Sequence, residues 1–249
     1  LIMTACLVPG QTIIGNAAME PEVESLANYL NSQCAKISGA GTPTITINGV
    51  EKISAGLCEI IPDRLEAGSF ALMAAATKSE LLIKNCWPKH IKSLLTIFDK
   101  IGVNYEAGDN WLKVLPSKNI KPYDIKTHEY PGFPTDLQAP YVVLMTQAQG
   151  TSLVQETIYD RRLIWTDMLS QMGAGITMCD PHRIVINGPS QLYGKKLISP
   201  DIRAGIALVI AALIAQGQTE IDNIYQLDRG YEKLDERLRT LGADIKRVA

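Results

Sequence analysis

Three arginines, Arg162, Arg203 and Arg229, stand at places in the sequence where their chemistry could serve an anionic ligand. Guanidinium groups bind carboxylate and phosphate with paired hydrogen bonds, and helix N-termini attract the same anions. If the segments that carry these arginines converge, we expect them to face one cleft. For any one of them, a solvated surface position is the more common alternative. The pattern therefore predicts an anion site, provided that the fold brings these segments together.

Three aspartates, Asp63, Asp136 and Asp201, each come just before an apolar helical run. An aspartate at that place is a good N-cap, because its carboxylate accepts hydrogen bonds from the free N–H groups of the first turn. A purely structural cap is thus the default interpretation of all three. Asp136 differs because residues 130–135, YPGFPT, form a rigid, proline-rich approach that could fix its carboxylate at the rim of a cleft.

The elements that must position these residues recur along the chain. Four stretches share an alanine- and leucine-rich helix, a turn, a short strand, a second helix and a hairpin, so each unit is predicted as βαβαββ. The turns lie at spacings of 69, 71 and 67 residues, at Gly10, Ser79, Gly150 and Gly217. The second helices end at spacings of 68, 71 and 69 residues, at Cys34, Gly102, Gly173 and Gly242. One period in two landmarks indicates units packed about a pseudo-symmetry axis.

The repeat also divides the chain. Each aspartate precedes its turn by 14 to 16 residues, and counting back equally from Gly10 leads to a point before Leu1. We therefore expect that this sequence starts in the middle of a longer protein. Residues 1–52 are predicted to be the final, truncated repeat of a first domain, and residues 53–249 to be a second domain of three βαβαββ units.

The composition disfavours several classes of protein. Lys and Arg number 24 against 26 Asp and Glu, and a net charge of −2 argues against a general nucleic-acid binder. No apolar run approaches the roughly 20 residues that a bilayer span needs, so we expect no membrane partner. The five cysteines are scattered without a CxxC pair, which argues against a disulfide framework and a zinc site. We expect a cytoplasmic protein with neither metal nor cofactor.

Three segments, PDRLEAG at 62–68, YPGFPTDLQ at 130–138 and LDRGYE at 227–232, resemble the bacterial UDP-N-acetylglucosamine 1-carboxyvinyltransferase family. The resemblance runs from Leu1 to Val248. It implies transfer of the enolpyruvyl group of phosphoenolpyruvate to the 3'-hydroxyl of UDP-N-acetylglucosamine, with release of phosphate, as the first committed step of peptidoglycan synthesis. It also implies an α/β fold, an inside-out barrel of two domains with three βαβαββ units each and the active site between them.

The resemblance implies a role for each candidate residue. Asp136 is expected near the attacking hydroxyl as general base, with Asp201 as a second carboxylate at the reacting centre. Ile158 is expected to contact the nucleotide sugar, and Asp63 joins the substrate-binding residues. The three arginines are expected to hold phosphoenolpyruvate, its carboxylate by Arg162 and Arg203 and its phosphate by Arg229. These roles agree with the need of a carboxylate and a phosphate dianion for several fixed cations.

The sequence departs from the family pattern in ways that keep other functions open. The family's catalytic loop, Lys-Asn pair and Val-Ser segment all precede the point that corresponds to Leu1. Arg161 stands where the family usually has Asn, and Met19 where it usually has a basic residue. One alternative is a non-catalytic fragment or paralogue that binds an anion or a partner chain, such as the missing N-terminal portion. Another is the shikimate-pathway enolpyruvyl transferase, which shares the fold but uses a different acceptor.

Overall fold

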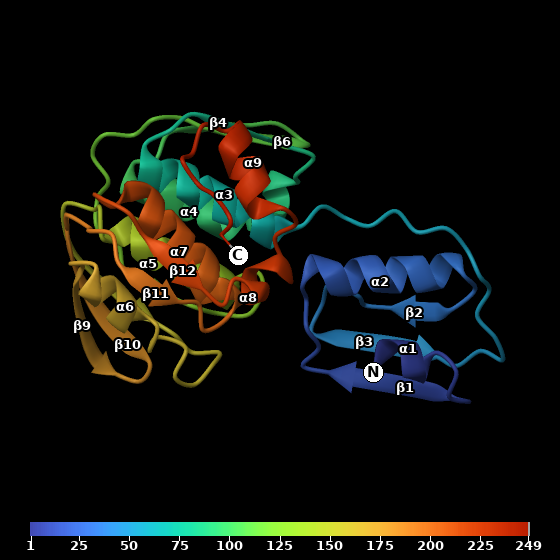
Figure 1. The fold of residues 1–249 in the computed structure, drawn as a ribbon. Helices are drawn as coiled ribbons and strands as arrows, with labels where there is room; N and C mark the ends of the chain where they lie inside the picture. Colours follow the sequence, from blue (N-terminus) through green and yellow to red (C-terminus); the bar gives the residue numbers. More distant parts are fainter. Residues whose placement is uncertain (249) are drawn as a thin grey trace. The chain divides into compact units, whose positions relative to one another are not determined.

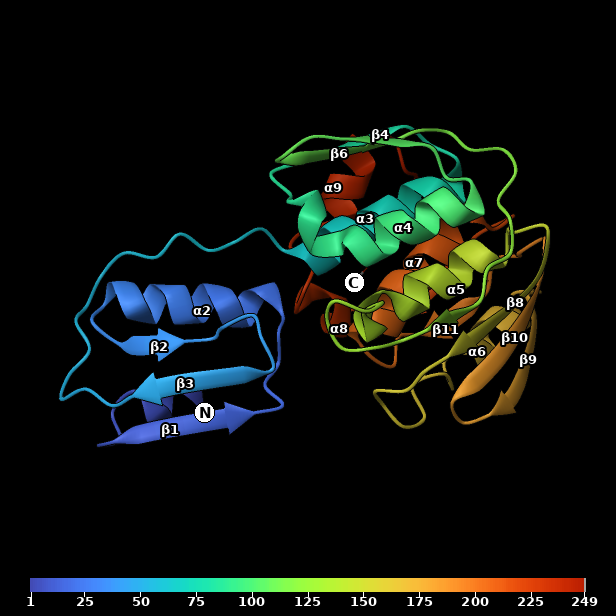
Figure 2. The ribbon, with the colours of Figure 1, turned by 180° about the vertical axis from the view of Figure 1, so that it is seen from behind.

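A computed structural model describes residues 1–248, which form two compact units (Figures 1 and 2). The smaller unit contains residues 1–62 and 129–132, and the larger contains residues 63–128 and the chain from Phe133 onward. None of the helices in residues 1–248 is long and apolar enough to cross a membrane. Within the same residues, no three His, Cys, Asp or Glu side chains gather into a group that could hold a metal ion.

The smaller unit is a three-stranded antiparallel sheet with helices packed on it. Its elements are α1 (Ile2–Ala5), β1 (Gln11–Gly15), α2 (Pro21–Ser32), β2 (Lys36–Ser38) and β3 (Thr44–Asn48), with strand order β1-β3-β2. Polar and apolar residues alternate in β3, and Ile45 and Ile47 are buried between exposed or half-buried neighbours. These two side chains pack with Ala27 and Leu30 of α2, which gives the unit its own core.

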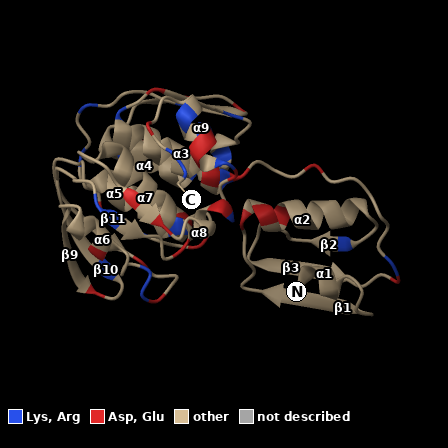
Figure 3. Cartoon of the chain, viewed as in Figure 1, with Lys and Arg blue, Asp and Glu red and all other residues tan. Residues whose placement is uncertain are grey.

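Three apolar helices form the centre of the larger unit: α3 (Arg64–Thr77), α5 (Gln138–Met145) and α7 (Ile202–Ile214). They pack on one another and are buried on nearly all sides, as expected of helices without a polar face. Gly68 permits this close packing, because a Cβ at that position would lie 2.5 Å from a methyl group of Leu137. α5 contains no charged residue, and the only charged residue in α7 is Arg203. Most of α7 is accordingly tan in Figure 3. Arg203 therefore stands out at the first turn of a core helix.

Small sheets and further helices surround these three helices. One sheet, in the order β4-β6-β5, contains β4 (Leu81–Lys84), β5 (Tyr105–Ala107) and β6 (Trp111–Val114), accompanied by η1 (Pro88–Ile91) and α4 (Lys92–Ile101). A second, in the order β7-β8-β10-β9, contains β7 (Ile125–Lys126), β8 (Gly150–Gln155), β9 (Gly175–Asp180) and β10 (Arg183–Gly188), with η2 (Thr135–Leu137) and α6 (Thr166–Gln171). The chain ends with a parallel pair, β11 (Lys196–Ile198) and β12 (Glu220–Asp222), then α8 (Tyr225–Asp228) and α9 (Leu234–Thr240).

The predicted repeat landmarks share one backbone conformation. Each second helix is followed by a residue with left-handed φ, +74° at Cys34, +83° at Gly102, +106° at Gly173 and +95° at Gly242. Glycine is favoured there because it lacks the Cβ that makes this region costly. The mixed α/β class is confirmed by the sheets and helices, while barrel closure, pseudo-threefold symmetry and the predicted domain division stay predictions.

The number of complete βαβαββ units is smaller than predicted. Within residues 1–248, only the stretch from β7 to β10 contains all six elements in order. In the described part of the chain, no strand is formed between β3 and α3, and none follows α9 up to residue 248. Leu57 and Ile60 lie in the first of these segments and are 99% and 79% exposed. These apolar side chains are therefore not buried, as they would be in a strand that packs on the core.

Candidate active site

Asp136, Arg162 and Arg203 form a compact cluster in the larger unit. Nη2 of Arg162 and Nε of Arg203 each donate to Oδ1 of Asp136 at 2.9 Å. The side chains of Arg162, Arg203 and Asp136 are 16%, 19% and 29% exposed, so the cluster is shielded but reachable from solvent. Two guanidinium groups converge on one carboxylate oxygen, an arrangement that can also receive the carboxylate of a ligand.

The predicted N-cap role is confirmed for two of the three aspartates. Oδ1 of Asp63 accepts from the backbone N–H groups of Leu65 and Glu66 at 2.8 and 3.0 Å. Oδ1 of Asp201 accepts in the same way from Arg203 and Ala204 at 2.7 and 2.8 Å. Both carboxylates therefore stabilise the first turn of a core helix, α3 and α7.

The N-cap prediction for Asp136 is wrong. Asp136 lies inside the 3-10 turn η2, and the cap position of α5 falls one residue later, at Leu137, without a side-chain cap. The carboxylate hydrogen-bonds two guanidinium groups instead, which are stronger partners than neutral backbone N–H groups because they carry charge. The carboxylate of Asp136 thus bridges the two arginines and does not cap its own helix.

Arg162 has two further contacts that fix its guanidinium. Nη1 donates to Oγ1 of Thr135 at 2.8 Å, and the guanidinium carbon lies 4.8 Å from the ring centre of Tyr159. A cation over an aromatic face gains about 0.5–1 kcal/mol at an exposed site. Together with the bond to Asp136, these contacts hold the planar group in one orientation.

Glu156 is a buried carboxylate next to this cluster that sequence reasoning did not select as a site residue. It directly follows β8 and is 0% exposed. Its partners are the hydroxyl groups of Thr127 and Thr135 and the backbone N–H groups of Ile158 and Tyr159. A signal existed in the sequence, because the equivalent positions in the other repeats are Asn16, Asn85 and Asn223, all with left-handed φ. The change from Asn to Glu at this one repeat position is the signal that could have marked it as a site residue.

Tyr231 links the cluster to the LDRGYE segment. It is 1% exposed, and its hydroxyl lies 2.8 Å from Oγ of Ser69. Burial raises the pKa of Tyr231, while the hydrogen bond with Ser69 and the positive charge of Arg203 act in the opposite direction. The hydroxyl therefore stays protonated at neutral pH.

The remaining predicted residues lie apart from the shared carboxylate. Ile158 is half-buried in the loop after β8, where its N–H donates to Glu156. Arg229 is exposed at the end of α8, and Nη1 donates to Oε1 of Gln226 at 3.3 Å. Arg161 is exposed, and its Nε lies 3.8 Å from a carboxylate oxygen of Asp160. The substrate roles expected of Ile158 and Arg229 stay predictions.

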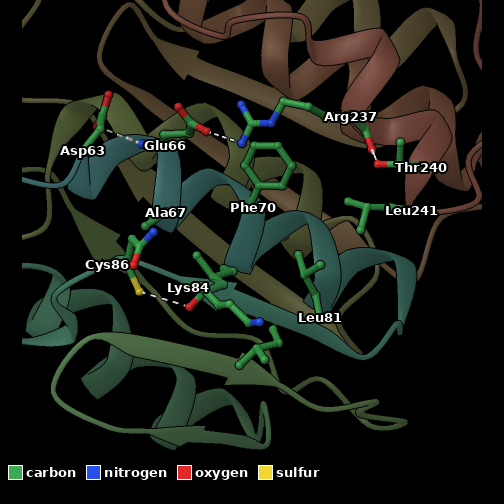
Figure 4. A pocket seen from close by; sticks show the side chains of 13 residues that line it. Asp63, Glu66, Ala67, Phe70, Leu81, Lys84, Cys86, Arg237, Thr240 and Leu241 are labelled. Atoms are coloured by element: carbon green, nitrogen blue, oxygen red, sulfur yellow. Dashed lines mark hydrogen bonds and ion pairs between the residues drawn. The ribbon is translucent and has the colours of Figure 1, made fainter.

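A separate cavity of about 400 Å³ lies between α3, β4 and α9, and Asp63 is the predicted site residue that lines it (Figure 4). Arg237 lines this cavity, where it forms an ion pair with Glu66 and its guanidinium carbon lies 4.8 Å from the ring centre of Phe70. The side chains of Leu81 and Leu241 add an apolar wall. Asp136 and its two arginines are absent from the lining, so the cavity and the cluster are different features.

Comparison with known proteins relates the chain to enolpyruvyl transferases. A family described as EPSP synthase (3-phosphoshikimate 1-carboxyvinyltransferase) matches residues 1–238. The chain is 44% identical over 248 residues to the UDP-N-acetylglucosamine 1-carboxyvinyltransferase of Koribacter versatilis, and 46% identical over 248 residues to that of Desulfosudis oleivorans. These matches cover 100% of this chain but only 57% and 59% of the two relatives.

Solved structures match the fold over nearly the whole chain. The enolpyruvyl transferase NikO from Streptomyces tendae has a TM-score of 0.91 at 25% identity, covering 98% of this chain and 58% of that one. EPSP synthase from Acinetobacter baumannii has a TM-score of 0.74 at 17% identity, covering 100% of this chain and 60% of that one. The second likeness concerns the fold alone.

Proposed function

Because the chain belongs to the EPSP synthase (3-phosphoshikimate 1-carboxyvinyltransferase) family, we propose that the full-length protein transfers an enolpyruvyl group from phosphoenolpyruvate to the 3'-hydroxyl of UDP-N-acetylglucosamine. The choice of acceptor rests on identities of 44% and 46% to relatives that carry that name. The chain spans 57% and 59% of those relatives, so the activity is proposed for the full-length protein. Such a protein would act in cell-wall synthesis in the cytoplasm.

The observation that supports this proposal best is the carboxylate shared by two arginines. Arg162 and Arg203 bind Oδ1 of Asp136, and the carboxylate of phosphoenolpyruvate offers them the same kind of acceptor. Exchange of one carboxylate for another keeps both guanidinium groups paired, so the substrate can replace Asp136 at small electrostatic cost.

Displacement also prepares Asp136 for proton transfer. Once the substrate occupies the arginines, the carboxylate of Asp136 becomes free to accept the proton of the attacking hydroxyl, as a general base. Arg229 is proposed to bind the phosphate, since it is exposed and its hydrogen bond to Gln226 is long, at 3.3 Å. Asp201, Asp63 and Ile158 are proposed near the substrates on the strength of the family resemblance.

The test is phosphate release by the full-length protein from phosphoenolpyruvate and UDP-N-acetylglucosamine. We expect phosphate release to require both substrates, and we expect Asp136→Ala to abolish it. Asp109→Ala, in an exposed turn of the same unit, is the matched control and should turn over normally. Undiminished turnover by Asp136→Ala would remove the proposed base.

Two other functions are tested in the same assay. The matching family carries the name of the shikimate-pathway enzyme, so 3-phosphoshikimate is the second candidate acceptor. Saturable release with 3-phosphoshikimate alone would assign that function instead. A protein that binds UDP-N-acetylglucosamine in a calorimetric titration but releases no phosphate with either acceptor would be a non-catalytic binder.

A further inference from the structure

Glu156 joins three segments that surround the arginine cluster. Its Oε1 accepts from Oγ1 of Thr127 at 3.0 Å and from the N–H groups of Ile158 and Tyr159 at 2.8 and 3.2 Å. Its Oε2 accepts from Oγ1 of Thr135 at 2.8 Å. A fully buried carboxylate is costly unless its hydrogen-bond capacity is used, and here four donors reach it. The residue therefore organises this part of the unit and is held rigidly by it.

The bond to Thr135 leads directly to Arg162. A hydroxyl has one proton, and Thr135 gives it to Glu156, so a lone pair is left facing Nη1 of Arg162 at 2.8 Å. The negative charge of Glu156 strengthens Thr135 as an acceptor through this relay. The same guanidinium donates through Nη2 to Asp136 at 2.9 Å. Glu156, Thr135, Arg162 and Asp136 thus form one continuous chain of hydrogen bonds.

We infer that Glu156 is a positioning residue, which acts through Thr135 to hold Arg162 in the orientation that receives the carboxylate of phosphoenolpyruvate. The inference rests on the proposed function for its substrate, but the orientation of Arg162 is a property of the ligand-free protein. Glu156 does not touch the reacting atoms in this scheme, so its removal affects substrate binding more than the chemical step.

The variant Glu156→Gln in the full-length protein tests the relay. The amide oxygen can keep the three contacts of Oε1, whereas the amide nitrogen places a donor beside Thr135. The hydroxyl then receives two donors and its own proton loses its acceptor. We expect the KM for phosphoenolpyruvate to rise about tenfold, since hydrogen bonds to charged groups are worth about 1.4 kcal/mol or more. The KM for UDP-N-acetylglucosamine and kcat should change much less.

A double-mutant cycle separates this role from a general loss of structure. Thr135→Val removes the hydroxyl, and adding Glu156→Gln to it should raise the KM for phosphoenolpyruvate little further, because both changes break the same relay. Glu106→Gln on β5 is the matched control, and we expect wild-type values for it. The inference would be overturned if the two substitutions raised the KM for phosphoenolpyruvate independently of each other. It would also be overturned if Glu156→Gln lowered kcat about tenfold and left KM unchanged.

A second measurement needs no turnover. In nitrogen-15 spectra of the ligand-free protein, the guanidinium protons of Arg162 should exchange slowly in wild type and faster in Glu156→Gln. If wild type releases no phosphate, the proposed function fails, and this signal still decides whether Glu156 orients Arg162. An Arg162 signal unchanged by Glu156→Gln would refute the positioning role.

Discussion

Removal of Asp136 is expected to strengthen the binding of phosphoenolpyruvate while it abolishes turnover. In the ligand-free protein Asp136 competes for Arg162 and Arg203, because Oδ1 lies 2.9 Å from a donor of each. Asp136→Ala removes this tethered competitor and leaves both guanidinium groups without their carboxylate. A residue that simply contacted the substrate would produce the opposite change in affinity, so the sign of the effect is decisive.

The size of the effect follows from the two hydrogen bonds. Each bond to a charged partner contributes about 1.5–3 kcal/mol when shielded. The three side chains are 16%, 19% and 29% exposed, so solvent screening reduces the sum. We take about 1.5 kcal/mol in total, which corresponds to roughly a tenfold lower Kd for phosphoenolpyruvate.

Calorimetric titration of the full-length protein with phosphoenolpyruvate alone is the assay. Asp136→Ala should bind about ten times more tightly than wild type, and Asp109→Ala should bind as wild type does. Near-UV circular dichroism of both variants checks that the fold is retained. Weaker or unchanged binding by Asp136→Ala would refute the displacement mechanism, whatever the variant does to phosphate release.

Three further changes test the framework around the site. Asp201→Ala removes the N-cap of α7 and should lower the free energy of unfolding in urea by about 1 kcal/mol. A variant as stable as wild type would count against the capping role. Gly68→Ala places a methyl group 2.5 Å from a methyl group of Leu137 and should lower the free energy of unfolding by about 1–3 kcal/mol in the same assay. An unchanged urea midpoint would show that Leu137 can move aside without cost. Asp228→Asn concerns pH, because Arg247 holds the pKa of Asp228 below its ordinary value. The pair contributes its stability above the ordinary carboxyl pKa of about 3.9 and loses it as pH falls through the lower folded value. The variant should therefore be less stable than wild type by about 0.5 kcal/mol at pH 7 and equal to it near pH 2, and a constant difference across that range would contradict the ion pair.

Local features were predictable wherever a few neighbouring residues decide the conformation. The caps at Asp63 and Asp201 involve N–H groups only two and three residues away. The ends of the second helices likewise depend on short segments, because glycine is favoured at the left-handed residue that follows three of them. Asp136 has a similar sequence context to the two capping aspartates, but its carboxylate has a stronger pair of partners elsewhere in the fold.

Those partners are distant in sequence, and only the tertiary structure decides which of them meet. Arg162 and Arg203 lie 26 and 67 positions after Asp136, on a loop and on another core helix, yet they bind one oxygen atom. The residue types alone indicated an anion site, because arginine and aspartate carry that chemistry wherever they stand. The close packing of α3, α5 and α7 determines that the first turn of α7 faces Asp136. The sequence thus determined the chemistry available to this protein, and the packing of its core helices determined which charges share a site.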